Sequence, residues 1–533
     1  MLRRALGSIT NHVERLVLFL FMFCVFICLI CGGLYHGDVD QTTYSEAIDY
    51  TFNSPLIFRW LILWLVAFFL IINLKIWDNR KQCIAFAFFC AIFVTVISLL
   101  FCIWNGYTPV SDQEQMWEGG IQLVYGDSTA FNARYFDQYH NQCGAAILAS
   151  FLIRLTGSRS YMSWRVLNCL CAGTNVLGIS YLTWVLSKDN RMTMVSTILT
   201  TCFIPFILYS ALVYGTLISL SFTIWSFAAA FRYLESGYKV DFISSAILCA
   251  LANATYSGTV IATVALTLTY LMRAGLEIKA GGKWIKFLLS AIVTILICMI
   301  YLNASEKYFY SHIGISDQQG IPATAYIYMG ITSDDEHSVC GPGTYNSENV
   351  NIYIENNRNS AQTREAANKE IKKALLEYLN GKRSLSFFAE KVRNQWADPW
   401  FSSLIMVINY YDIDRPLMDS FKNFLASGLI GKIQTFLTSY IIVTYTFSAL
   451  YALKTFFSKR HKAKKVCSEK HLIYLYFVGG FIFYLFWESK ARYCLPYFTM
   501  LLPFASIEIV KFNCCLQERL KGCVILKNKP FGD

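Results

Sequence analysis

Charged residues are scarce in this sequence, and long uncharged stretches are common. Asp, Glu, Lys and Arg together make up 15% of the 533 residues, whereas 55% of the chain is hydrophobic. A soluble domain of this size would not leave its apolar positions in such long continuous blocks. A membrane β-barrel would instead contain short segments of alternating polarity. The composition therefore predicts an all-α polytopic membrane protein.

Patterns typical of several other protein classes are also missing. Among the 18 cysteines, no CxxC or Cys/His spacing suggests a structural zinc site. Most of them lie in apolar runs, where Cys behaves as a small buried hydrophobe. We place only Cys143 and Cys340 in external segments, where they could pair. We predict no disulfide framework, no metal site and no cofactor, and we find no internal repeat or transporter-like pair of broken helices.

Twelve apolar segments are candidates for membrane-spanning helices. A helix needs roughly 20 residues to cross a hydrocarbon core of about 30 Å, and residues 83–104 supply that length without a charge. The first apolar run lacks a small-residue cleavage pattern, so we expect it to be a retained signal anchor. The twelve segments are residues 16–34, 56–74, 83–104, 166–186, 194–212, 217–231, 242–256, 258–271, 284–302, 433–453, 472–486 and 497–510.

A thirteenth apolar run, residues 144–153, is too short to cross, because ten helical residues rise only about 15 Å. We assign it to the external interface. Every basic loop, from DNRKQ at 78–82 to SKRHKAKK at 458–465, then lies on one side, which the positive-inside rule identifies as cytoplasmic. The sequence thus predicts both termini in the cytoplasm. Because the net charge of +11 is concentrated at helix ends, nucleic acid is not an expected partner.

Two long segments are predicted on the external side. We divide the chain into residues 1–302, a membrane core that includes the first external loop at 105–165, residues 303–432, an external cap, and residues 433–533, the last membrane helices with a basic tail. These ranges follow the order of the apolar runs and basic loops.

Two helices are predicted within the external cap. EIKKALLEYL has apolar residues at helical spacing, with Asn380 and Gly381 as its stop. Ser384 is expected to cap the helix SLSFFAEKVRNQW, on which we interpret Lys391 and Arg393 as a solvated face. We expect Trp396 and Trp400 to be interfacial anchors, with stacking on a sugar as the alternative.

Acidic residues directly follow the apolar run that ends at Trp104. Asp112, Glu114 and Glu118 lie in PVSDQEQMWEGG, and the segment GD…YF..Y.nq.G follows them. This order resembles the first external loop of the GT-C superfamily of membrane glycosyltransferases, particularly the protein mannosyltransferase and aminoarabinose transferase branch (glycosyltransferase family 39-like). The positions that carry the resemblance are Asp112, Gly126, Asp127, Tyr135, Phe136, Tyr139, Asn141, Gln142 and Gly144.

Three further places resemble the same family. SWRVLN contains Arg165 at the external start of a helix, and YSALVYGTLISLSF contains Tyr214 in an external turn. WESKARYCLPYF is similar to the signature that precedes the final helices, here with Glu488, Lys490, Arg492 and Tyr493. Two positions depart from the family: His140 stands where relatives often have Pro, and Gly215 stands where an Asp is common.

The resemblance implies a GT-C-like core and an inverting transferase that takes a sugar from a polyprenyl-phosphate-linked donor. The acceptor would be an extracytoplasmic polysaccharide, teichoic acid, lipid or protein of the cell envelope. Such a transfer needs one general base, because the phosphate leaves without protonation. We expect Asp112 to be that base, with a solvated loop carboxylate as the alternative. Glu114 is the second candidate catalytic residue; it could orient the acceptor or cap a juxtamembrane helix.

The departing phosphate needs cationic partners, which Arg165, Lys490 and Arg492 could supply; ordinary interfacial anchoring is the alternative for Arg165 and Arg492. The rest of the expected substrate-binding set is Tyr139, His140, Asn141, Glu488 and Tyr493. A transporter or flippase of lipid-linked oligosaccharides is the alternative function, but it would carry charges inside its helices. A noncatalytic scaffold would leave Asp112 replaceable.

Overall fold

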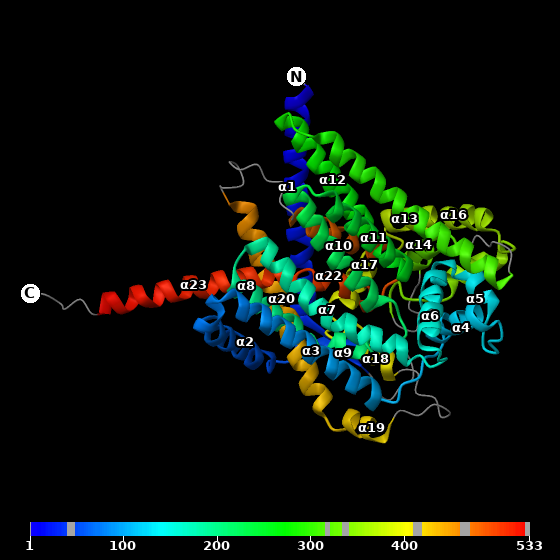
Figure 1. The fold of residues 1–533 in the computed structure, drawn as a ribbon, viewed down its shortest axis with the longest axis horizontal. Coiled ribbons are helices and arrows are strands. Elements are labelled where there is room, and N and C mark those ends of the chain that lie inside the picture. The colour runs from blue at the N-terminus through cyan, green and yellow to red at the C-terminus, as the bar shows by residue number, and fades with distance from the viewer. Residues whose placement is uncertain are drawn as a thin grey trace, which may run out of the picture.

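The computed structural model describes residues 2–39, 48–314, 320–332, 341–408, 418–458 and 470–527. Apart from one two-stranded ribbon, the elements in these ranges are helices (Figure 1). Eight helices of the described residues are long and apolar enough to cross a membrane, and two shorter apolar helices, Ile57–Ile72 and Lys470–Phe486, accompany them. The chain is therefore an all-α, multi-pass membrane protein, as its composition predicts.

All twelve predicted segments are helical, although two of them are interrupted. Residues 194–212 are divided between α8 and α9, and residues 497–510 between α22 and α23; Pro205 and Pro503, which lack an N–H, lie in the first turns of α9 and α23. The helices of this part are α1 (Leu2–Leu34), α2 (Ile57–Ile72), α3 (Arg80–Trp104), α7 (Met162–Ser187), α8 (Asn190–Thr201), α9 (Pro205–Tyr209), α10 (Thr216–Ser236), α11 (Lys239–Thr255), α12 (Val260–Ala280), α13 (Trp284–Ile313), α20 (Leu429–Phe457), α21 (Lys470–Phe486), α22 (Leu495–Thr499) and α23 (Leu502–Lys527).

Ion pairs connect helix ends that the sequence assigns to the same side. Arg191 pairs with Asp78 at 2.8 Å, and Lys188 pairs with Glu235 at 3.5 Å, all four at ends predicted to be cytoplasmic. Of the elements predicted to be external, α4 (Asp112–Tyr125), α5 (Ala133–Gln138), α6 (Cys143–Thr156), α14 (Ala323–Thr332) and α16 (Ser360–Leu379) lie at the opposite end from the tip of α23 (Figure 1). Apart from Ser458, the basic loop at 458–465 lies outside the described residues.

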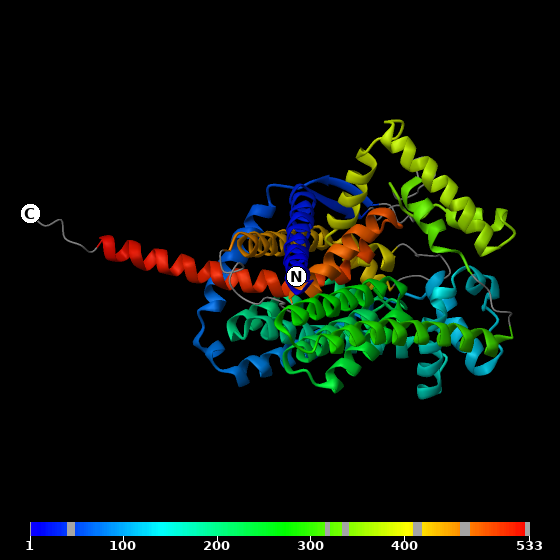
Figure 2. The same ribbon diagram turned by 90° about the horizontal axis from the view of Figure 1, so that it is seen from above.

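The elements predicted to be external form two groups. The first predicted external segment contains α4 (Asp112–Tyr125), α5 (Ala133–Gln138) and α6 (Cys143–Thr156). The α6 helix corresponds to the run at 144–153, and with 14 residues it is not among the helices long enough to span. The second segment contains α14 (Ala323–Thr332), α15 (Glu348–Glu355), α16 (Ser360–Leu379), α17 (Ser386–Trp396), α18 (Ser403–Ile408) and α19 (Asp419–Ala426), and Figure 2 shows α16 as an arm above α4–α6.

The two predicted cap helices exist, but one predicted surface is wrong. The α16 helix ends at Leu379 with Asn380 as its C-cap and Gly381 at φ +70°, as its sequence predicts. On α17, which begins two residues after Ser384, Lys391 is fully buried rather than solvated. Arg393 is partly buried and lies near the rings of Tyr35 and Tyr50. The reason is that other chain segments cover this face of α17.

The two tryptophans predicted as interfacial anchors are interior residues. Trp396 stacks on Phe481 with 5.7 Å between ring centroids, and Trp400 Nε1 donates to Gln434 Oε1 at 3.4 Å. Both side chains are buried by α20 and α21, so they contribute to packing rather than to a membrane interface. The α13 helix also continues to Ile313, past the expected end of its span at residue 302.

An antiparallel ribbon that the sequence reading did not predict lies in the first acidic loop. It is formed by β1 (Tyr35–Val39) and β2 (Ile48–Phe52), with Gly37 opposite Tyr50. Tyr50 donates its hydroxyl to Asn394 O at 2.6 Å, which attaches the ribbon to α17. The ribbon therefore packs against α17 and lies beside the chain segment that follows α21, where Ile48 and Tyr50 line a small hollow with Lys490 and Arg492.

Candidate functional site

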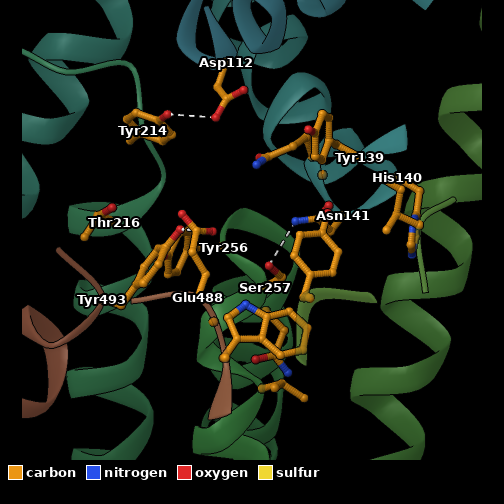
Figure 3. Close-up of a pocket in the computed structure, with 18 of the residues that line it drawn as sticks. Asp112, Tyr139, His140, Asn141, Tyr214, Thr216, Tyr256, Ser257, Glu488 and Tyr493 are labelled. Atoms are coloured by element: carbon orange, nitrogen blue, oxygen red, sulfur yellow. Dashed lines mark hydrogen bonds between the residues drawn. The ribbon is translucent and has the colours of Figure 1, made fainter. Parts of the chain in front are cut away.

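A cavity of about 910 Å³ lies at the end of the helix bundle that the sequence predicts to be external, and Figure 3 shows residues that line it. It is bounded by the start of α4, the α5–α6 connection, the α11–α12 turn, the C-terminal half of α13, α14 and the segment after α21. Eight of the ten predicted site residues line it: Asp112, Tyr139, His140, Asn141, Glu488, Lys490, Arg492 and Tyr493. The structure thus brings together residues that are up to 381 positions apart in the chain, 493 minus 112.

Asp112 is the first residue of α4, where the helix dipole favours a negative charge. The preceding residue, Ser111, has φ 54° and ψ −128°, a conformation that non-glycine residues rarely adopt. Gln113 is buried and accepts from Val213 N–H at 2.7 Å while donating to the Tyr107 hydroxyl at 2.6 Å. These bonds fix the start of α4 against the turn before α10.

Tyr214 links the carboxylate to the cationic side of the cavity. Its hydroxyl donates to Asp112 Oδ2 at 3.1 Å, and its ring centroid lies 5.2 Å from the Arg492 guanidinium carbon (Figure 3). A guanidinium at this distance from an aromatic ring is held by a cation–π attraction. Asp112 and Arg492 therefore contact the same tyrosine, Asp112 at its hydroxyl group and Arg492 at its ring.

The segment from Trp487 to Tyr493 carries a chain of polar contacts. Arg492 donates to the Tyr493 hydroxyl at 3.0 Å, and that hydroxyl donates to Glu488 Oε2 at 2.9 Å. Lys490 Nζ lies 3.6 Å from Glu488 Oε1. The carboxylate of Glu488 thus orients both cations, and Arg492 and Lys490 can face an anion in the cavity.

The remaining predicted residues connect loops around the cavity. Asn141 donates to Ser257 Oγ at 3.1 Å, and the Tyr139 hydroxyl lies 3.4 Å from that of Tyr345. Burial lowers the pKa of His140, so its imidazole is neutral at pH 7. Burial, with the Asp112 carboxylate nearby, raises the pKa of Tyr135 well above its ordinary value, so this phenol stays protonated.

Two predicted site residues are not at the cavity. Arg165 is buried, its Nε donates to Ala211 O at 2.9 Å, and its Nη2 donates to Tyr107 O. These carbonyls belong to the same network that positions Gln113, so Arg165 supports the wall from behind. Glu114 lies in the first turn of α4, partly exposed, and is not among the residues that line the cavity.

Gly215, one of the two positions that differ from the glycosyltransferase pattern, has a steric explanation. A Cβ atom there would lie 2.2 Å from Thr255 O, so the turn before α10 leaves no room for an aspartate side chain. The neighbouring Thr216 does line the cavity. In this chain the turn therefore contributes an aromatic ring and a hydroxyl group instead of a second carboxylate.

Several lining residues could not be found from short motifs. Glu306 lies on the part of α13 beyond the predicted span, and Tyr326 stacks on Trp487 with 5.0 Å between ring centroids. Trp487 does stand beside the motif that begins at Glu488, which could have suggested it. Tyr326 and Tyr345 have no comparable sequence signal.

No protein-family model matches this chain, and no curated protein is significantly similar to it. Among the described residues, no three His, Cys, Asp or Glu side chains gather closely enough to hold a metal ion. The predicted partner of Cys143, Cys340, lies outside the described residues.

Proposed function

We propose that this protein is a GT-C type inverting glycosyltransferase. It moves a sugar from a polyprenyl-phosphate-linked donor to an extracytoplasmic cell-envelope acceptor, which is a polysaccharide, a teichoic acid, a lipid or a protein. The observation that carries the proposal is a cavity lined by a carboxylate, Asp112, and a guanidinium, Arg492, both of which contact Tyr214.

The cavity also has an apolar side suited to a lipid-linked substrate. Val260, Leu302 and Phe483 line it, and Val260 is 41% exposed at the start of α12. The outward faces of α12 and α13 continue this apolar surface with Val264 and Ile300. A polyprenyl chain could therefore lie against these helices while its phosphate enters the cavity.

The proposed reaction has a single displacement step. The acceptor hydroxyl oxygen attacks the anomeric carbon while the Asp112 carboxylate takes its proton. The bond between that carbon and the phosphate oxygen breaks, and its electron pair leaves with the polyprenyl phosphate. Arg492 and Lys490 stabilise the charge that develops on this phosphate. Attack opposite the leaving group inverts the anomeric configuration.

The proposal includes twelve membrane crossings with both termini in the cytoplasm and the site on the external side of the cell membrane. The distribution of Lys and Arg supports this orientation. The ion pairs between Arg191 and Asp78 and between Lys188 and Glu235, which join helix ends of one predicted side, support the alternation of the helices.

The test is sugar transfer by the purified protein from defined polyprenyl-phosphate sugars. Asp112→Asn removes the base and keeps the side-chain size, so kcat should fall about a hundredfold or more while thermal unfolding changes little. Glu114→Gln, on the same helix but away from the cavity, is the matched control and should lose less. Full transfer by a folded Asp112→Asn protein would refute the assigned base, and loss only in Glu114→Gln would move the base by two residues.

A further inference from the structure

Lys391 is a charged side chain with no exposed surface and no place in the cavity wall. Its Nζ donates to Gly330 O at 2.6 Å and also to Trp487 O. Gly330 lies in the last turn of α14, and Trp487 directly follows the end of α21. Terminal carbonyls of a helix lack intrahelical partners and form the negative end of its dipole, so one amine satisfies acceptors at two helix ends.

The chain around Lys391 is packed so closely that glycine at positions 330 and 343 has no room for a side chain. A Cβ on Gly330 would lie 2.5 Å from Phe486 O, and one on Gly343 would lie 2.8 Å from Lys391 Nζ. Gly343 has φ +73°, and its carbonyl accepts from Ser489 N–H at 2.6 Å. The Lys391 amine is therefore enclosed by the backbone of α14 on one side and by the backbone of the segment after α21 on the other.

A second side chain of α17 reaches the same region. Gln395, one helical turn after Lys391, donates to Tyr484 O at 2.8 Å. Together the two side chains hold backbone carbonyls at both ends of residues 484–487. The side chains of Trp487 and Glu488, immediately beyond, line the cavity.

We propose that Lys391 is a positioning residue that clamps the ends of α14 and α21 and thereby places Trp487, Glu488 and the cations that follow. The effect of Lys391 on the two helix ends does not depend on what the protein does, whereas its effect on sugar transfer rests on the proposed function. Burial lowers the pKa of Lys391 to about 7, while Glu488 acts in the opposite direction. Both protonation states keep at least two N–H donors, so the clamp persists on either side of this pKa.

The experiment compares Lys391→Met with the parental full-length protein by amide hydrogen exchange. Methionine has a similar length and no donor, so the variant leaves two buried carbonyls without a partner. We expect exchange to become faster, by about tenfold or more, in residues 484–493 and 323–332, with little change in α3 and α7. Lys372→Met, at an exposed position on α16, is the control and should leave these segments unchanged.

Kinetics separate positioning from a general loss of folded protein. A misplaced Glu488–Arg492 segment should raise KM for the polyprenyl-phosphate sugar about fivefold or more, whereas partial unfolding would lower only the apparent kcat. Unchanged exchange in residues 484–493 of a folded Lys391→Met protein would overturn the clamp. If that variant cannot be purified, Lys391→Gln is measured instead against the same criterion, because its side chain is one bond shorter and its amide cannot reach both carbonyls at once.

The two proposals can fail separately. If the parental protein transfers no sugar from any polyprenyl phosphate, the proposed function is wrong, while the exchange result still decides whether Lys391 clamps the helix ends. If transfer occurs but exchange near Trp487 does not respond to Lys391→Met, only the clamp is wrong.

Discussion

The two arginines that we predict from the sequence to hold a donor phosphate have different surroundings. Arg165 is buried and donates from Nε to Ala211 O and from Nη2 to Tyr107 O, so its guanidinium is bound to backbone carbonyls outside the cavity lining. Arg492 lines the cavity between the rings of Tyr214 and Tyr493. At the scale of single residues, both side chains are arginines, but only the one that lines the cavity can bind a ligand there.

Replacing each arginine by lysine should therefore have a different effect. Arg492→Lys should raise KM for the donor and lower transfer about tenfold, because a point charge loses the planar fork that a phosphate matches. Arg165→Lys should instead lower the thermal unfolding temperature, since one ammonium cannot reproduce both carbonyl bonds. Steady-state kinetics and thermal unfolding in detergent distinguish the two effects. A raised donor KM in a thermally unchanged Arg165→Lys protein would contradict this assignment.

At the scale of elements, the position of Asp112 depends on how closely α4 crosses α6. A Cβ on Gly120 would lie 2.6 Å from Ala149 Cβ and 2.9 Å from Ser150 N. The two helices meet through glycine on one side and small residues on the other. This crossing anchors the helix whose first residue is the proposed base.

Gly120→Ala should separate these helices, lower the thermal unfolding temperature and reduce transfer, because overpacking at a close crossing costs about 1–3 kcal/mol and shifts the backbone. Gly431→Ala is the control, because no atom lies within 4 Å of a Cβ at that position on α20. Equal stability and equal transfer in the two variants would show that the α4–α6 crossing has room to adjust.

At the scale of the whole molecule, the proposal requires the cavity and the end of α23 to lie on opposite sides of the membrane. Cys514 and Cys515 are exposed on α23, and Thr129 is exposed between α4 and α5. These positions provide native and introduced reporters for the two predicted sides.

In a Cys340→Ser background, a membrane-impermeant maleimide should leave the protein of intact cells unlabelled and should label it after permeabilisation. Adding Thr129→Cys should produce labelling in intact cells, because the α4–α5 loop is predicted to be external. The readout is the gel shift of the labelled protein. Labelling of Cys514 and Cys515 in intact cells, together with protection of Thr129→Cys, would reverse the orientation.

Much of the helical arrangement could be predicted because hydrophobic length and local stop residues act over short stretches of chain. The apolar run at 83–104 is a helix, Asn380 and Gly381 end α16, and the run at 144–153 forms a helix too short to span. The motif near Asp112 and the motif from Glu488 to Tyr493 also predicted eight of the residues that line the cavity, since each places several lining residues within a short segment.

The sequence alone thus determined the membrane class, the positions of the helices and two short motifs of the site, all of which depend on neighbours along the chain. Tertiary structure decided that Lys391 is buried, that Arg165 supports the wall and that Glu306 reaches the cavity. Each of these outcomes depends on contacts between segments far apart in sequence, such as α17 with the end of α21. No local pattern of residues specifies which distant backbone carbonyl will meet a given side chain.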